Sequence, residues 1–187
     1  VSMMTLMENG AAIESATIGW EGAVGLSAAA APRHSLSRAI VQTPCRCSRI
    51  GSSQLHEAWA KSPRIREMVD RNGEALLAHT AQSAACNALH SVEARFCRWL
   101  LTCHDRISTD TVALTQEFLA DMLGVQRTTV TAVARRLQDK GWIRYRRGIV
   151  DIVDRDGLQS ATCECYEAVR RQYERLAPPS PRVETPR

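Results

Sequence analysis

The sequence has no apolar run near the roughly 18–20 residues that a membrane-spanning helix requires. Its one long stretch free of Asp, Glu, Lys and Arg is Ala75–Val92, and polar residues such as His79 and Gln82 interrupt it. The N-terminus places no basic residue before an apolar core, which argues against a secretory signal. We therefore expect a soluble, cytoplasmic protein without a membrane partner.

A disulfide framework is also missing. The seven cysteines are an odd number and are scattered, unlike those of a secreted scaffold. They include two Cys-x-Cys pairs, Cys45 with Cys47 and Cys163 with Cys165. The first pair could share one face of a strand, whereas on a helix Cys163 and Cys165 would point about 200° apart. A metal centre needs about four converging ligands, so we expect no metal site and no cofactor.

Catalytic motifs are equally scarce. The sequence contains no evident Ser-His-Asp or paired-carboxylate arrangement, and no glycine-rich phosphate loop follows a predicted strand. His104, next to Cys103, is interpreted as a surface histidine near a helix end. We therefore expect a protein that is not an enzyme.

Ordinary globular composition and focused charge are present. Hydrophobic residues make up 44% and charged residues 24% of the 187 positions, which argues against wholesale disorder. The net charge of +4 arises between residues 114 and 150, where seven basic residues accompany three acidic ones. Such focusing is typical of a surface that meets phosphates, although an ordinary solvated face gives the same pattern.

The first fifty residues have β character. Four short strands are expected, at Met3–Met7, Ala16–Ile18, Arg38–Gln42 and Arg46–Ile50. Asn9-Gly10 between the first two is a strong hairpin signal, because both residues tolerate positive φ. So few strands cannot close a β-domain. Either a segment precedes Val1 in the natural protein, or this part is incomplete and weakly stable.

A long helix is predicted from Arg64 to His90, because Ser62-Pro63 supplies a favourable start. Positions spaced by threes and fours form a narrow seam that is apolar at first and softer later: Ile65, Val69, Asn72, Leu76, His79, Ser83, Cys86 and His90. Such a helix usually packs against a partner helix, and Asn72 and His79 would set its register in a dimer. The alternative is a helix that lies across its own domain.

Residues 91–153 carry the most ordered pattern. The expected elements are a helix after Ser91, a helix from Thr115 to Gly124, a helix from Arg127 to Asp139, and strands at Trp142–Tyr145 and Ile149–Val153. Apolar spacing predicts their buried positions: Phe96, Trp99, Leu100, Phe118, Leu119, Met122, Leu123, Val130, Val133, Ala134 and Leu137. One further amphipathic helix is expected over Asp154–Leu176, before a proline-rich, disordered tail. Two helices joined by a tight glycine turn, followed by an arginine-bearing hairpin, are the plan of a winged helix-turn-helix.

The exposed face of the predicted recognition helix suits contact with DNA. Arginine forks guanine edges, while threonine hydroxyls and methyls meet phosphates or thymine methyls. The alternative is that the threonines are simply exposed helix positions. Each threonine, however, destabilises a helix by roughly half a kcal/mol relative to alanine. Three threonines on an exposed face without a function are therefore unfavourable. Arginines in the hairpin add affinity through the phosphate backbone. The predicted DNA-binding residues are Thr115, Gln126, Arg127, Thr128, Thr129, Thr131, Arg135, Arg146 and Arg147.

The segment Leu114–Arg127, together with Gly141–Tyr145, resembles the DNA-binding domain of Crp/Fnr-type bacterial transcription regulators. Ser91–Leu101 is similar to the helix that precedes this domain, and Glu21–Leu26 and Val41–Pro44 are similar to the last part of the family's cyclic-nucleotide-binding-type β-roll. The resemblance implies an α+β chain with a partial β-roll at 1–60, a dimerisation helix at 61–90, a winged helix-turn-helix at 91–176 and a disordered tail at 177–187.

Two departures from the family concern its effector. The β stretch is shorter than the family's β-roll, as if the first half of the sensor domain were lost. Members that bind cyclic AMP carry Gly-Glu-Leu and Arg-Ser at the phosphate. This chain has Gly25-Leu26-Ser27 without the glutamate and Ser35-Leu36 without the arginine, with Arg33 and Arg38 nearby. We therefore expect no cyclic-nucleotide binding.

The resemblance also implies partners. It implies a homodimer on a palindromic site in double-stranded DNA, with reading heads about 34 Å apart, and RNA polymerase as a further partner. Arg127 matches the family's arginine, whereas Thr128 and Ala132 replace the glutamate and second arginine of many members, which predicts an unusual operator. Two alternatives stay open: a truncated remnant that serves as a dimerisation or protein-interaction module, and a sensor of a small anionic effector.

Overall fold

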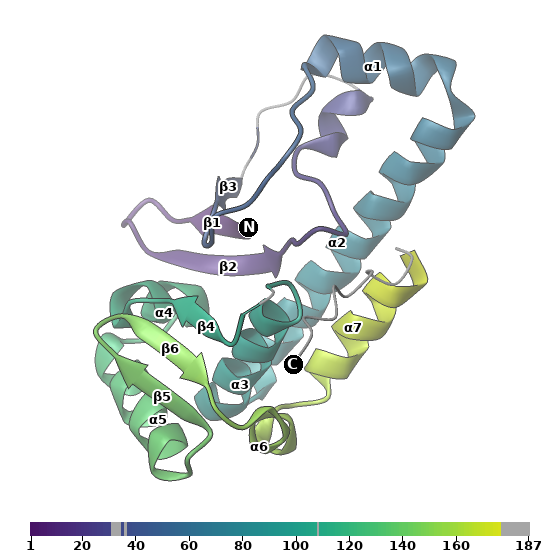
Figure 1. Ribbon diagram of the computed structural model, residues 1–187. Coiled ribbons are helices and arrows are strands. Elements are labelled where there is room, and N and C mark those ends of the chain that lie inside the picture. The colour runs from purple at the N-terminus through teal and green to yellow at the C-terminus, as the bar shows by residue number, and fades with distance from the viewer. Residues whose placement is uncertain (31–34, 36, 108, 177–187) are drawn as a thin grey trace.

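The computed structural model describes residues 1–30, 35, 37–107 and 109–176, which leaves the predicted tail and Arg33 outside the described residues (Figure 1). The strands are β1 (Ser2–Leu6), β2 (Ala12–Thr17), β3 (Ser37–Ile40), β4 (Thr111–Ala113), β5 (Ile143–Arg146) and β6 (Ile149–Ile152). The helices are α1 (Ser52–Lys61), α2 (Pro63–Leu89), α3 (Val92–His104), α4 (Gln116–Leu123), α5 (Arg127–Asp139), α6 (Arg155–Ala161) and α7 (Cys165–Leu176), with a 3-10 helix at Leu26–Ala29. This mixture confirms the α+β fold class. None of the described helices is long and apolar enough to cross a membrane.

The first sheet is antiparallel, with the order β2-β1-β3. As predicted, Asn9-Gly10 closes its hairpin, where Met7 N donates to Ala11 O at 2.8 Å and Gly10 has a φ of 84°. The strand expected at Arg46–Ile50 is wrong. Those residues are exposed and pair with no strand in the part of the chain that the structure describes, because they lead away from the sheet toward α1. Without a neighbour for its backbone groups, an extended segment forms no ladder.

The long helix α2 is confirmed. Ser62 separates it from α1 and caps it, because its Oγ accepts a hydrogen bond from Ile65 N at 3.4 Å. Pro63 follows as the first helical residue, where its missing N–H costs no hydrogen bond. The start of α2 thus follows the rules that predicted it.

The suggested role of Asn72 and His79 as register residues between two chains is wrong, because both bind within this chain. Asn72 Oδ1 accepts a hydrogen bond from Ala23 N at 3.1 Å. His79 is 2% exposed, and its Nδ1 lies 3.1 Å from Tyr173 Oη on α7. This side of α2 therefore packs on its own chain, as the alternative interpretation expected.

The single helix expected over Asp154–Leu176 is also wrong, because the chain turns at residues 162–164. Asp154 Oδ1 caps α6 by accepting from Gly157 N at 2.9 Å. Thr162 then adopts extended backbone, with a φ of −77° and a ψ of 163°, which ends α6. The turn sends α7 back alongside α2 (Figure 1). A continuous helix would lose this packing, and threonine at the break is a weak helix former.

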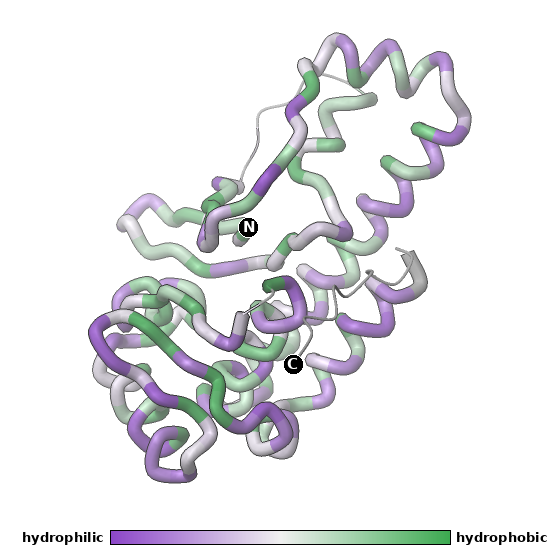
Figure 2. The backbone as a smooth tube through the Cα atoms, viewed as in Figure 1, coloured by the Kyte–Doolittle hydropathy of each residue, from purple (hydrophilic) through white to green (hydrophobic). Residues whose placement is uncertain are grey.

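The main core lies between α3, α4, α5 and the second sheet, whose order is β4-β6-β5. Nearly all of the predicted apolar positions are buried there: Phe96, Trp99, Leu100, Leu119, Met122, Leu123, Val130, Val133, Ala134 and Leu137. Phe118 packs against it while partly exposed. Figure 2 shows strong hydrophobic colour along β6, the central strand of this sheet. The three-residue strand β4 was not predicted from the sequence.

The first sheet contributes to the same core. Met4 on β1 is 1% exposed and belongs to it. Trp99 Nε1 on α3 donates a hydrogen bond to Glu14 Oε2 on β2 at 2.6 Å, and burial raises the pKa of Glu14. The N-terminal strands are therefore bound directly to the helix that precedes the helix-turn-helix.

Candidate nucleic-acid interface

The turn between α4 and α5 is tight and depends on one glycine. Gly124, which was predicted to end this helix in a tight turn, caps α4 in the left-handed conformation with a φ of 61° and a ψ of 42°. Val125 N then donates to Ala120 O at 3.0 Å, which closes the turn. This geometry fixes α5 against α4 and determines which face of α5 points outward.

Helix α5 buries an aliphatic face and exposes a polar one. Val130, Val133 and Leu137 are at most 2% exposed. The exposed side and the first turn carry most of the predicted DNA-binding residues: Gln126, Arg127, Thr128, Thr131 and Arg135. Thr129 departs from this set, because it is half-buried and lines a hollow with Ser91 at the start of α3.

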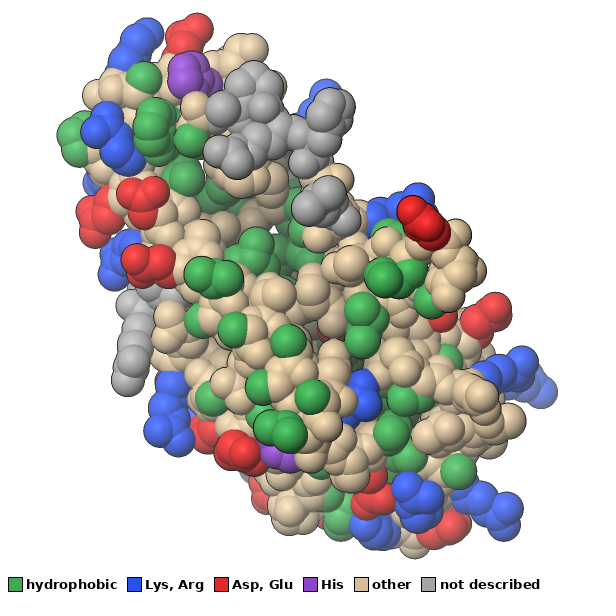
Figure 3. All heavy atoms as spheres, turned by 180° about the vertical axis from the view of Figure 1, so that it is seen from behind, with side chains coloured by type: hydrophobic (Ala, Val, Ile, Leu, Met, Phe, Trp, Pro, Cys, Tyr) green, Lys and Arg blue, Asp and Glu red, His purple; other side chains and the backbone are tan. Residues whose placement is uncertain are grey.

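The basic residues of segment 114–150 divide into two groups. Arg136 Nε and Lys140 Nζ lie 2.9 and 2.8 Å from the Glu93 carboxylate on α3, and the contact with Lys140, followed by that with Arg136, lowers the pKa of Glu93. The other five have no ion pair within the described residues: Arg127, Arg135, Arg144, Arg146 and Arg147. Basic side chains project from the end of the molecule that carries α5 (Figure 3). These five arginines are free to meet phosphates.

The hairpin of β5 and β6 forms the wing. Arg147 has a φ of 50° and Gly148 a φ of 77°, the two positive values that a type I′ turn requires. The turn is anchored at the start of α4, because Leu114 N donates to Gly148 O at 2.6 Å and Tyr145 Oη donates to Leu114 O at 2.8 Å. The wing turn at Gly148 therefore lies next to Thr115.

Two of the predicted hydroxyl contacts are partly used inside the domain. Thr115 Oγ1 accepts a hydrogen bond from Phe118 N at 3.1 Å, which makes Thr115 the N-cap of α4. Thr131 Oγ1 donates to Gln116 Oε1 at 3.0 Å. Burial raises the pKa of Tyr145 in the wing, and the charge of Arg127 opposes this rise. The sequence thus predicted residues that the fold brings together, while their contact with DNA remains a prediction.

One cluster of possible metal ligands was not predicted from the sequence. The ligand atoms of Cys86, His90, Cys163 and Cys165 lie within 4.8 Å of one another. The expectation that Cys163 and Cys165 point apart is wrong, because Cys163 lies in the turn before α7 and not on a helix. The available signal was Cys86-x3-His90, a spacing that puts both side chains on one helical face. The other pair, Cys45 and Cys47, is exposed.

Residues 94–161 match a family model described as the Crp-like helix-turn-helix domain. The chain carries a Crp-like helix-turn-helix domain. No curated protein matches the sequence. The Crp-like domain covers α3 to α6, including the turn at Gly124 and the wing, so the matched segment is the one that the structure organises around α5.

Most of the chain shares its fold with solved Crp/Fnr regulators. A CRP-family transcriptional regulator from Thermus thermophilus superposes with a TM-score of 0.71 at 19% identity, covering 86% of this chain and 82% of that chain. FixK2 from Bradyrhizobium japonicum gives 0.64 at 14% identity, covering 87% and 82%. The c-di-GMP responsive global regulator CLP from Xanthomonas campestris gives 0.58 at 20% identity, covering 81% and 79%. These likenesses establish the Crp/Fnr fold outside the Crp-like domain as well.

Proposed function

We propose that the chain is a sequence-specific DNA-binding transcription regulator that acts as a homodimer on a palindromic site. The observation that carries the proposal is a set of five arginines without ion pairs among the described residues, placed on the outer face of α5 and on the wing: Arg127, Arg135, Arg144, Arg146 and Arg147. Unpaired guanidinium groups on one surface of a helix-turn-helix are the charge arrangement that DNA phosphates neutralise.

The two parts of this surface have different tasks. The first turn of α5 enters the major groove, where Arg127 forks a guanine and Thr128 contacts a neighbouring base or phosphate. Arg146 and Arg147 on the wing contact the sugar-phosphate backbone and add affinity without sequence choice. The DNA-bound regulator then acts on RNA polymerase.

The dimer forms through the outer face of α2, which we define as Gly73, Leu77, Ala81, Ala84 and Ala88. All five are exposed, Leu77 is 71% exposed, and no charged residue occurs between Ala75 and Val92. A long, exposed helical face without charge is unfavourable in water and is satisfied when a second copy covers it. Pairing of two α2 helices about a two-fold axis gives the two reading heads that a palindromic site requires.

Selection from a randomised DNA pool with purified protein at near-physiological salt tests the proposal. An inverted repeat is expected, with half-sites about one helical turn apart (~34 Å). Arg127→Ala should weaken enrichment and relax the preference at one base pair of each half-site, whereas the matched control Arg171→Ala, an exposed residue on α7, should leave both unchanged. Recovery of no motif, with binding that disappears as salt rises, would contradict the proposal and favour a dimerisation or protein-interaction module.

A further inference from the structure

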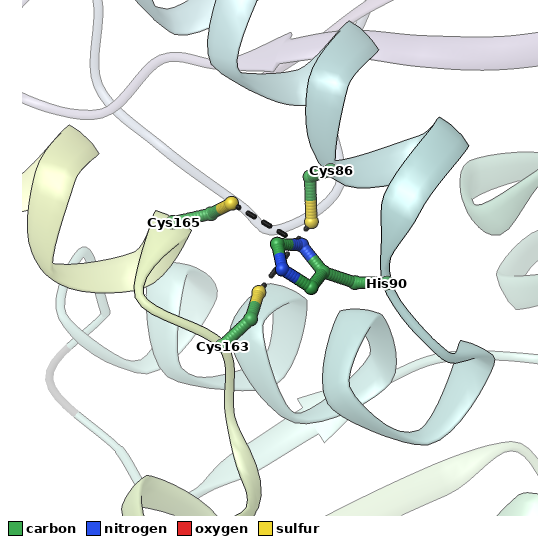
Figure 4. Close-up of side chains that lie close together, drawn as sticks. All are labelled: Cys86, His90, Cys163 and Cys165. Carbon is green, nitrogen blue, oxygen red and sulfur yellow. Dashed lines mark hydrogen bonds between the residues drawn. The ribbon is translucent and has the colours of Figure 1, made fainter.

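Four side chains with metal-binding atoms converge where α2 ends and α7 begins. Cys86 and His90 come from the end of α2, Cys163 comes from the turn before α7, and Cys165 is the first residue of α7 (Figure 4). Cys86 Sγ lies 3.5 Å from Cys163 Sγ, and Cys165 Sγ lies 3.5 Å from His90 Nδ1. Segments more than seventy residues apart in sequence therefore supply one compact set of ligands.

We propose that these four residues form a Cys3His site for a single Zn²⁺ ion, which is independent of the DNA-binding surface. In a tetrahedral zinc centre, Zn–S bonds of about 2.3 Å and Zn–N bonds of about 2.0 Å place neighbouring ligand atoms roughly 3.5–3.8 Å apart. The two 3.5 Å separations match this spacing. A four-iron cluster holds each ligand on a different iron and needs a wider set than one contained within 4.8 Å.

The groups around the ligands have the arrangement that a metal site requires. His90 Nε2 lies 3.2 Å from Glu164 Oε1, which leaves Nδ1 directed at the Cys165 sulfur. A carboxylate on the far nitrogen of a metal-bound histidine fixes its tautomer and orientation. Gln82 Nε2 donates to Cys165 Sγ at 3.0 Å, a contact that stabilises a thiolate. Both outer contacts therefore favour the metal-binding form of their ligands.

The buried cysteines and the positive charge near them also support a metal site. The three cysteines are buried and none forms a disulfide. Three thiolates and a neutral histidine on Zn²⁺ carry one net negative charge, and the buried Arg98 guanidinium acts on Cys86 as a nearby positive charge. Arg98 Nε is buried and has no hydrogen-bond partner among the described residues.

The principal competing occupant is a covalent bond between two of the sulfurs. Cys86 Sγ and Cys163 Sγ are close enough for oxidation to join them. A disulfide, however, uses only two of the four residues. It does not explain why Cys165, His90 and Glu164 lie close together. Zinc uses all four residues and both outer contacts.

The site would fasten the end of the long helix α2 to the start of α7, which follows the Crp-like domain. His90 is the C-cap of α2, and the next residue, Ser91, is the N-cap of α3. Zinc at His90 therefore restrains the joint between α2 and the domain that carries α5.

The test measures metal on the full chain, purified under reducing conditions without chelator. Elemental analysis should find one zinc per chain, and titration of the metal-free protein with Co²⁺ should give tetrahedral absorption with a thiolate charge-transfer band. In Cys86→Ser and in Cys165→Ser, the charge-transfer band should be weaker than in the wild type, and each variant should bind Zn²⁺ at least tenfold more weakly. Cys47→Ser, which alters the exposed Cys-x-Cys pair, is the matched control and should bind like the wild type.

Glu164→Gln tests the site even if the cysteine variants misfold. The Glu164 side chain is 78% exposed, so its loss should leave the far-ultraviolet circular dichroism unchanged. We expect it to weaken zinc binding by about 10- to 100-fold. The proposal is overturned if the folded wild type binds neither Zn²⁺ nor Co²⁺, or if all cysteine variants bind equally well. Mass spectrometric detection of a Cys86–Cys163 disulfide, or of an iron-containing chromophore, in the freshly purified chain would also overturn it.

Discussion

Helices α2 and α5 are both half-buried, but their faces have opposite character. The buried face of α5 is aliphatic, with Val130, Val133 and Leu137, and its exposed face carries arginine and threonine. In α2 the buried face is mostly polar or sulfur-bearing (His79, Ser83 and Cys86 beside Ala75), whereas the outer face consists of glycine, alanine and leucine. Helix α5 is built to face water or phosphate, while α2 turns its least polar face outward.

The difference shows why the two helices need different partners. An exposed face with charges remains soluble without a partner and attracts an ion of opposite sign. An exposed face without charge gains free energy only when another surface removes it from water. The inner face of α2 is polar because its partner α7 offers polar groups, such as Tyr173 Oη next to His79. This contrast supports the proposal that the outer face of α2 belongs to an interface.

A charge on the outer face of α2 tests this interpretation and has the largest expected effect. In the proposed dimer, Ala84→Glu places a carboxylate from each copy in the interface, where burial without a partner costs about 3 kcal/mol or more. The dissociation constant of the dimer should rise by at least about 100-fold. Light scattering across a concentration series would show monomers at concentrations where the wild type is dimeric.

Ala168→Glu is the matched control, because Ala168 is exposed on α7 and has the same change in helix propensity. It should leave the dimer intact. If Ala84→Glu and Ala168→Glu are both dimeric, α2 is not the dimer helix and the proposed contrast with α5 fails.

The corresponding change on α5 is Arg127→Ala. Loss of a guanidinium that forks a guanine should weaken specific DNA binding by about 1–3 kcal/mol, roughly 5- to 150-fold, and should relax the preference at one base pair of each half-site. The change is on an exposed residue, so the dimer and the melting temperature should be preserved. Equal affinity of the variant for the selected site, measured by anisotropy, would remove Arg127 from the interface.

The polar inner face of α2 can be tested by pH. Burial, aided by the charges of Arg106 and Arg98, lowers the pKa of His79 to about 3. Between this value and the ordinary pKa near 6.5, the unfolded chain binds a proton that the folded chain does not, so stability falls as the pH falls. From pH 7 to pH 5 this residue should cost about 2 kcal/mol of unfolding free energy.

Urea unfolding of the wild type and of His79→Gln at both pH values isolates the contribution of this residue. The variant should lose about 2 kcal/mol less than the wild type over this interval. Both proteins retain the same cysteines and the same other histidines, so their contributions cancel in the difference. Equal losses would mean that His79 is protonated in the folded state.

The Crp-like domain was predictable because its signals are local. The left-handed turn at Gly124, the cap at Thr115 and the apolar spacing of α5 each depend on residues close in sequence. The hairpin at Asn9-Gly10 was predictable for the same reason. In each case hydrogen bonds within a few residues decide the backbone, so a local pattern is sufficient.

The remainder depends on contacts between distant segments. The sequence pattern continues a helix through Thr162, and only the packing of α7 on α2 explains why the chain turns there. The helical wheel consequently separated Cys163 from Cys165, and the cluster with Cys86 and His90 was missed. The sequence also could not show which basic residues remain without an ion pair. Glu93 pairs with Arg136 and Lys140, which lie more than forty residues away in the sequence.

The smallest effect is expected for Arg147→Asn in the wing, where stability and DNA affinity should change in opposite directions. Arg147 holds a φ of 50° at the first turn position before Gly148, a conformation that asparagine adopts more readily than arginine. Arg147→Asn should therefore raise stability by a few tenths of a kcal/mol while removing one phosphate contact. Affinity should fall by a similar factor for all DNA sequences, and the dependence of log K on log salt should become shallower by about 0.9. A variant that is more stable yet binds DNA less tightly would show that the wing retains a strained arginine because of its charge. An unchanged salt dependence would confine the DNA-binding surface to α5.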